Sequence, residues 1–143
     1  MARAHFLEAL LDRRGIPHLL RNERSGLTLA TALEPAFDSD SRRRGLLGRN
    51  GLNPGEAVVL APCCAIHTLF MRFTIDVVFV QRDGVVTKVC RGVKPWRAAV
   101  ALGAFAAIEL AEGGTGRGAA KRGDRLFLDS APLSAPDKTT IFP

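Results

Sequence analysis

The segment from Ile66 to Val80 constrains the fold of this chain most strongly, because its side chains alternate with a period of two for much of its length. Successive side chains of a β-strand point to opposite faces, so this alternation predicts a strand with one buried face. The predicted inward side chains are Leu69, Met71, Phe73, Ile75, Val77 and Phe79, and the outward ones are Arg72, Thr74 and Asp76. A segment of this length is long for one strand, which favours a bend or bulge near Phe70–Arg72.

An Asp-Gly turn at Asp83 and Gly84 follows this segment and predicts a β-hairpin. If these two residues form the loop, the register places Asp76 opposite Arg91. Such a cross-strand charge pair contributes only about 0.2–1 kcal/mol, yet it is an ordinary structural role for Asp76. The same register pairs Val78 with Val89, and Val77 with Cys90. It also places Lys88 opposite Phe79 on the inward face, so either the Lys88 side chain extends past the end of the sheet or the turn is longer than two residues.

Shorter patterns predict the remaining elements. Apolar residues at helical spacing before Gly15 indicate a short helix. Residues 18–33 contain two apolar stretches around a turn and predict a second hairpin. Asp38–Ser41 can cap a short helix over RRRGLLG, with Leu46 and Leu47 turned inward. AVVL at 57–60 and RLFLD at 125–129 predict strands.

Residues 98–112 allow two interpretations. Their alanines and Glu109 favour a helix by propensity. Glycines interrupt the segment, however, and Ile108 and Leu110 flank Glu109 as in a strand with an outward carboxylate. The residues alone leave both alternatives open.

The length of 143 residues fits one domain. We expect an N-terminal helical extension over 1–17, a mainly β domain over 18–129, and a proline-containing tail over 130–143 that need not be ordered. No run approaches the roughly 20 apolar residues that cross a bilayer. Charged groups near the N-terminus interrupt any signal-like stretch, so we expect a cytoplasmic protein.

The charge balance is basic, with 20 Lys and Arg against 14 Asp and Glu. The excess is spread along the chain, and only Arg42–Arg44 form a cluster. A protein surface that binds along a nucleic-acid backbone needs more basic side chains to contact the phosphates, and aromatic side chains that stack on the bases. This chain has one Trp and no Tyr. The composition therefore argues against specific nucleic-acid binding.

Three cysteines, Cys63, Cys64 and Cys90, are expected to be reduced. Adjacent Cys63 and Cys64 followed by His67 resemble half of a metal site, but zinc thiolates are usually separated by two to four residues. We therefore expect no metal site and no cofactor. A Cys64–His67 nucleophilic pair is disfavoured by its apolar neighbours.

Five blocks occur in an order that resembles a known family: RRRGLLGR, IHTLFMRFTIDVVFV with its Asp-Gly turn, KPWR, AIELAEG and KRGDRLFL. Over about residues 22–128 the chain is similar to the domain of unknown function 192. The resemblance implies a compact, mainly β domain like a sandwich or jelly roll with one or two short helices. It also implies a strand near Ile108, and no established activity.

Five side chains are the candidate ligand-binding residues: His67, Arg72, Asp76, Trp96 and Arg97. A His with a carboxylate is the usual general-base arrangement, and an aromatic between basic residues suits stacking and charge recognition. Each also has a structural interpretation: a backbone-bonded His67, an exposed Arg72, an Asp76 paired with Arg91, and a Trp96 covering the core.

The interpretation we adopt is a noncatalytic module that binds a small ligand or a protein at one end of the domain. A hydrolytic enzyme is the alternative, with Asp76 or His67 as general base and Arg72 stabilising negative charge. A homodimer is left open, and no substrate or partner can be named from the residues.

Overall fold

A computed structural model describes residues 4–12, 16–116 and 118–131, and it confirms a mainly β domain. Most of the predicted tail over 130–143 lies outside the described residues. In chain order the elements are η1 (Glu8–Leu11), β1 (His18–Asn22), β2 (Thr28–Ala30), β3 (Ala32–Ala36), α1 (Ser39–Arg44), β4 (Glu56–Leu60), β5 (Ala65–His67), β6 (Ile75–Val80), β7 (Val86–Val93), β8 (Ala98–Val100), β9 (Ala106–Ala111) and β10 (Leu126–Ser130).

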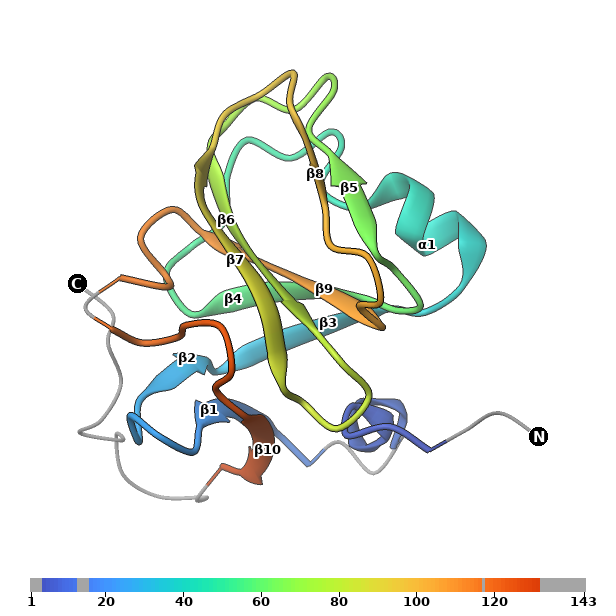
Figure 1. Cartoon of the computed structure of the whole chain (residues 1–143). Coiled ribbons are helices and arrows are strands. Elements are labelled where there is room, and N and C mark those ends of the chain that lie inside the picture. Colours follow the sequence, from blue (N-terminus) through green and yellow to red (C-terminus); the bar gives the residue numbers. More distant parts are fainter. Residues whose placement is uncertain (1–3, 13–15, 117, 132–143) are drawn as a thin grey trace.

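A five-stranded sheet in the order β3-β4-β9-β6-β7 forms the middle of the molecule. Strands β3 and β4 run parallel, and the other neighbours in this sheet are antiparallel. A three-stranded sheet, β10-β1-β2, lies on one side of it, and the pair β5-β8 lies with α1 on the other (Figure 1). Both faces of the five-stranded sheet are therefore covered.

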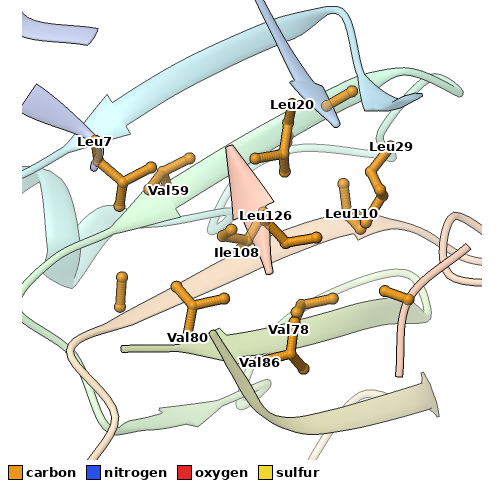
Figure 2. Close-up of a cluster of buried hydrophobic side chains, with 14 of the residues drawn as sticks. Leu7, Leu20, Leu29, Val59, Val78, Val80, Val86, Ile108, Leu110 and Leu126 are labelled. Atoms are coloured by element: carbon orange, nitrogen blue, oxygen red, sulfur yellow. The ribbon is translucent and has the colours of Figure 1, made fainter. Parts of the chain in front are cut away.

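Two buried apolar clusters occupy these two faces, because alternate side chains of β4, β6 and β9 point to opposite sides. Figure 2 shows the cluster facing β1, β2 and β10, which includes Leu20, Leu29, Val59, Val78, Val80, Ile108, Leu110 and Leu126. The cluster facing α1 and β5 includes Leu46, Val58, Leu60, Ile66, Met71, Ile75, Val77 and Phe79. The central strands are thus apolar on both faces.

The prediction of one long alternating strand over 66–80 is wrong. The chain forms β5, leaves the sheet over residues 68–74, and then forms β6. The expected bend is present at Phe70, whose backbone φ is 64°. Leu69 is 38% exposed, and all six residues of β6 are buried, because sheet neighbours and both clusters surround that strand.

The β6–β7 hairpin is confirmed, with Val77 opposite Cys90 and Val78 opposite Val89. The register shifts at both ends of β6, so the expected Asp76–Arg91 pair is wrong. Lys88 is exposed and its Nζ donates a hydrogen bond to the carbonyl of Val100 (2.9 Å).

Gly84 in the β6–β7 turn has a φ of 89°. A Cβ at this position would collide with the carbonyl oxygen of Leu126. The Leu126 amide in turn donates to the Gly84 carbonyl (2.8 Å). Only glycine satisfies both the backbone conformation and this close approach.

The predicted short elements are present, but both helices differ from the prediction. The helix predicted over RRRGLLG instead spans Ser39–Arg44, so only the three arginines of that block are helical. The N-terminal helix is a single 3-10 turn over Glu8–Leu11, and β1 and β2 form the expected hairpin. The Asp38 carboxylate accepts a hydrogen bond from the Ser41 amide (2.8 Å) and caps α1. Leu46 is buried as expected, whereas Leu47 is exposed because α1 ends at Arg44.

Candidate functional site

A cleft of about 410 Å³ lies between α1, the chain before β5, and β9. Its volume falls within the range of small-molecule sites. Its lining combines apolar side chains with charged and polar groups. The apolar wall is made by Leu46, Leu47, Leu60, Pro62, Ile66 and Met71.

Glu109 contributes the carboxyl group of this cleft from the middle of β9. Its side chain is 4% exposed, and its Oε2 has no hydrogen-bond partner within the described part of the chain. Burial raises the pKa of Glu109 to about 7, and the Arg49 charge opposes this shift. The predicted outward carboxylate is therefore wrong: Glu109 pairs with Val58 and Val77 in neighbouring strands and points to the buried side that they share.

Three consecutive arginines of α1 line the same cleft. Arg42 is engaged in the fold, because its guanidinium donates to the carbonyls of Phe37 (2.6 Å) and Ala61 (3.2 Å). Arg43 and Arg44 are exposed. The cleft therefore combines a buried acid with positive charge at its rim.

His67 and the two adjacent cysteines complete the lining. The Nδ1 atom of His67 accepts a hydrogen bond from the Leu69 amide (3.3 Å), which places the proton of a neutral ring on Nε2. Cys63 donates from Sγ to the Ala65 carbonyl (3.1 Å), and burial raises the pKa of this thiol. A thiol held protonated in this way is a poor nucleophile.

Asp76, a predicted site residue, is buried on the opposite side of the sheet from Glu109. It is 1% exposed. Its Oδ1 accepts from the Gly92 amide (3.0 Å), and its Oδ2 accepts from the amide (3.1 Å) and hydroxyl (2.7 Å) of Thr115. Arg91 instead donates to the carbonyls of Thr115 and Ala120. Asp76 thus fixes the chain that follows β9.

The other predicted residues lie on the loops that follow β5 and β7. Arg72 is exposed and donates to Asn50 Oδ1 (2.8 Å). Trp96 is 57% exposed, so it does not cover the core, and Arg97 donates to the Trp96 carbonyl (3.2 Å). Among the five predicted residues, only His67 lines the cleft that contains Glu109.

Comparison with known proteins identifies the family. The family model for DUF192, described as uncharacterized ACR, matches residues 20–128, more than half of the chain. The chain belongs to the DUF192 family. No curated protein matches it.

Two solved structures share the fold of this DUF192 chain. One, from Sinorhizobium meliloti, is described as a "putative transcription regulator"; it is 21% identical with a TM-score of 0.66, over 79% of this chain and 92% of its own. The other, from Novosphingobium aromaticivorans, is described as a protein of unknown function; it is 22% identical with a TM-score of 0.66, over 80% and 87%. At these identities the likeness concerns the fold alone.

Glu109 is not among the five predicted ligand-binding residues of this DUF192 chain, because an outward strand position was preferred for it over a place at a pocket rim. Its signal was the single charge inside the run AAIELA, because a strand that is apolar on both parities is buried on both faces.

No group of three or more His, Cys, Asp and Glu side chains that could hold a metal gathers in the described ranges. No helix in that part of the chain is long and apolar enough to span a bilayer.

Proposed function

We propose that this protein is a noncatalytic binding module that holds a small ligand in the cleft beside Glu109. The observation that carries the proposal is the buried Glu109 Oε2, which lacks a hydrogen-bond partner in the described structure and borders a cavity of about 410 Å³. An unsatisfied buried polar atom costs roughly 1–3 kcal/mol. A ligand that donates a hydrogen bond would remove that cost.

The lining defines the chemistry of the ligand. A donor group such as an ammonium would face Glu109, and a short apolar body would contact Leu46 and Ile66. An acidic group would lie toward Arg43 and Arg44 at the rim. The proposed ligand is therefore a small zwitterion with an apolar middle.

Calorimetric titration with 6-aminohexanoate, hexylamine and hexanoate tests this chemistry. We expect the zwitterion to bind most tightly and hexanoate least, and Glu109→Gln to weaken both amines selectively. Because the pKa of Glu109 is about 7, amine binding should strengthen between pH 6 and pH 8 as the carboxyl group ionises. Glu112→Gln is the matched control, since Glu112 is exposed and directly follows β9. Equal affinities for the three probes, or no effect of Glu109→Gln, would contradict the proposal.

A hydrolytic enzyme is the second candidate, because His67 lines the same cleft as Glu109. The enzyme predicted from the sequence uses Asp76 or His67 as general base and Arg72 as anion stabiliser. Asp76 is buried and already accepts three hydrogen bonds, and Arg72 is bound to Asn50. Hydrolysis of p-nitrophenyl acetate that disappears in His67→Ala, with the fold intact, would favour this candidate over the binding module.

A further inference from the structure

Two loops at one end of the molecule present a pair of aromatic rings to solvent. Phe70, in the loop after β5, is 70% exposed, and Trp96, in the loop after β7, is 57% exposed. Their ring centroids are 4.7 Å apart. Both loops lie at the upper end of the molecule in Figure 1. Neither residue lines the cleft that contains Glu109.

The backbone is strained at both aromatic residues. Phe70 has a φ of 64° and Trp96 a φ of 65°, and in the described ranges these are the non-glycine residues with positive φ. This left-handed conformation is unfavourable for bulky side chains, and such strain persists only where the surrounding structure enforces it. Contacts with the surrounding structure must therefore hold both loops in this conformation.

Thr68 holds the two loops together. It is fully buried, and its hydroxyl donates to the Lys94 carbonyl (2.6 Å) and accepts from the Arg97 amide (2.9 Å). Its own amide donates to the Arg97 carbonyl (2.8 Å), and its carbonyl accepts from the Trp96 amide (3.0 Å). The backbone of the loop that carries Trp96 is thus held against the loop that carries Phe70 before any partner binds, which lowers the entropy lost on binding.

The two loops that carry the aromatic pair also carry an excess of positive charge. Arg72, Lys94 and Arg97 are exposed, and none of them forms an ion pair with a carboxylate within the described residues. Residues 67–74 and 91–97 contain no Asp or Glu. The charge selects an anionic partner, and the rings select one that also offers an apolar or interfacial layer.

We infer that Phe70 and Trp96, with Arg72, Lys94 and Arg97, form a docking surface for an anionic phospholipid bilayer. Aromatic side chains favour the interface between headgroups and acyl chains, and nearby cations are attracted to anionic headgroups. Both rings are more than half exposed on loops and lie outside the cleft beside Glu109, so they can enter a soft surface without a complementary pocket. This inference does not depend on the ligand of the cleft.

The fluorescence of Trp96 reports directly on this surface, since the chain has one Trp and no Tyr. Titration with vesicles of phosphatidylcholine and phosphatidylserine should shift the emission to shorter wavelength as Trp96 enters the interface. Vesicles of phosphatidylcholine alone should cause little shift. The shift should also weaken as salt is added, because exposed charges are screened.

Two variants separate the contributions of the rings and the charges. Phe70→Gly removes one ring and suits the positive φ, so the fold should persist while the vesicle affinity falls. Lys94→Glu/Arg97→Glu should weaken vesicle binding at least about tenfold. Lys121→Glu/Arg122→Glu is the matched control, because it changes the net charge equally at exposed positions outside these loops.

The inference fails if anionic vesicles produce no shift, or if the control pair weakens binding as much as Lys94→Glu/Arg97→Glu. It also fails if a soluble poly-glutamate peptide or an oligonucleotide reproduces the shift at lower concentration than vesicles, which would assign the surface to a soluble acidic partner. Circular dichroism confirms that each variant is folded. Retained binding of 6-aminohexanoate would show that the cleft is unaffected, so the two proposals can fail separately.

Discussion

Asp76 and Glu109 are buried carboxylic acids on neighbouring strands of one sheet, yet their surroundings differ completely. Residue Val77 pairs with Glu109 and Asp76 pairs with Leu110, so the two acids point to opposite faces. Asp76 accepts three hydrogen bonds. Glu109 leaves Oε2 unsatisfied in the described structure. Burial alone therefore does not distinguish a structural acid from a binding one, whereas the hydrogen-bond donors around it do.

The difference arises from the segments that cover each face. The chain after β9 returns over Asp76 and brings the Thr115 amide and hydroxyl to it. On the other face, α1 and the chain before β5 leave a cleft, and Glu109 borders it. One face supplies hydrogen-bond donors to its acid, and on the other face the acid borders a cleft.

Replacing Asp76 should have the largest effect on stability. Asp76→Ala leaves the Gly92 amide and both Thr115 donors without their acceptor in a buried setting. Each hydrogen bond to this carboxylate contributes about 1.5–3 kcal/mol, and single substitutions rarely cost more than about 4–5 kcal/mol. We therefore expect a loss of roughly 4–5 kcal/mol in the free energy of unfolding. Urea denaturation measures it. A loss below about 1 kcal/mol would remove the contrast with Glu109.

Replacing Glu109 should increase the free energy of unfolding above neutral pH, whereas replacing Asp76 should decrease it. The pKa of Glu109 is raised from 4.5 to about 7, so the folded state keeps a proton that the unfolded state has lost. The free energy of unfolding should therefore fall by roughly 3 kcal/mol as the pH rises from about 4.5 to about 7.

In Glu109→Gln this component of the pH dependence should disappear, leaving the variant more stable than the parent at pH 8. Urea denaturation at a series of pH values measures the difference between the two proteins. Parallel pH profiles for the parent and the variant would show that Glu109 is not the origin of this dependence.

Asp124 extends the comparison to a buried acid that is paired with a cation. Its carboxylate accepts from the Arg24 guanidinium (2.7 Å), from Asn22 Nδ2 (2.7 Å) and from the Lys121 amide (2.9 Å). The hydrogen bond from Arg24 is the main cause that lowers the pKa of Asp124 to about 2.

A lowered pKa stabilises the folded state above the pKa of the unfolded chain, so this stability should be lost as the pH falls from about 4 toward 2. Because the Arg24 side chain is 43% exposed, we expect about 1–2 kcal/mol after solvent screening. Thermal unfolding of the parent and Asp124→Asn at pH 6 and pH 2.5 measures it. An equal difference at the two pH values would contradict this assignment.

The smallest effect on the free energy of unfolding is expected from removing one hydrogen bond that Asp76 accepts. Thr115→Val removes the hydroxyl that bonds Asp76 Oδ2 at 2.7 Å but keeps the amide bond and the side-chain shape. We expect a loss of about 1 kcal/mol by urea denaturation. Thr115→Ser keeps the hydroxyl and should remain close to the parent, so equal losses in the two variants would show that packing, and not this hydrogen bond, is responsible.

The local part of the fold could be predicted from the sequence because it depends on neighbouring residues. The Asp-Gly turn predicted the β6–β7 hairpin and its central register. Residues 38–41 predicted a cap for a short helix, and the structure uses Asp38, the first of them. The order of short blocks predicted the family. The hairpin and the cap need only turn geometry, strand periodicity and capping, whereas the family rests on the resemblance of the blocks.

The predictions failed where a second layer covers the sheet. Alternation was interpreted as one inward and one outward face, so Asp76 and Glu109 were both placed toward solvent. Val78 and Val80 share the parity of Asp76, and this apolar parity was the available sign that both faces are buried.

The sequence by itself determined the turns, caps and short strands of a mainly β domain, because these are properties of adjacent residues, and the order of its blocks identified the DUF192 family by resemblance. Only the tertiary structure decided that Asp76 holds a loop while Glu109 borders a cleft. Thr115 lies 39 residues from Asp76 along the chain. The donors that satisfy a buried acid come from such distant segments, and no local pattern specifies where those segments meet.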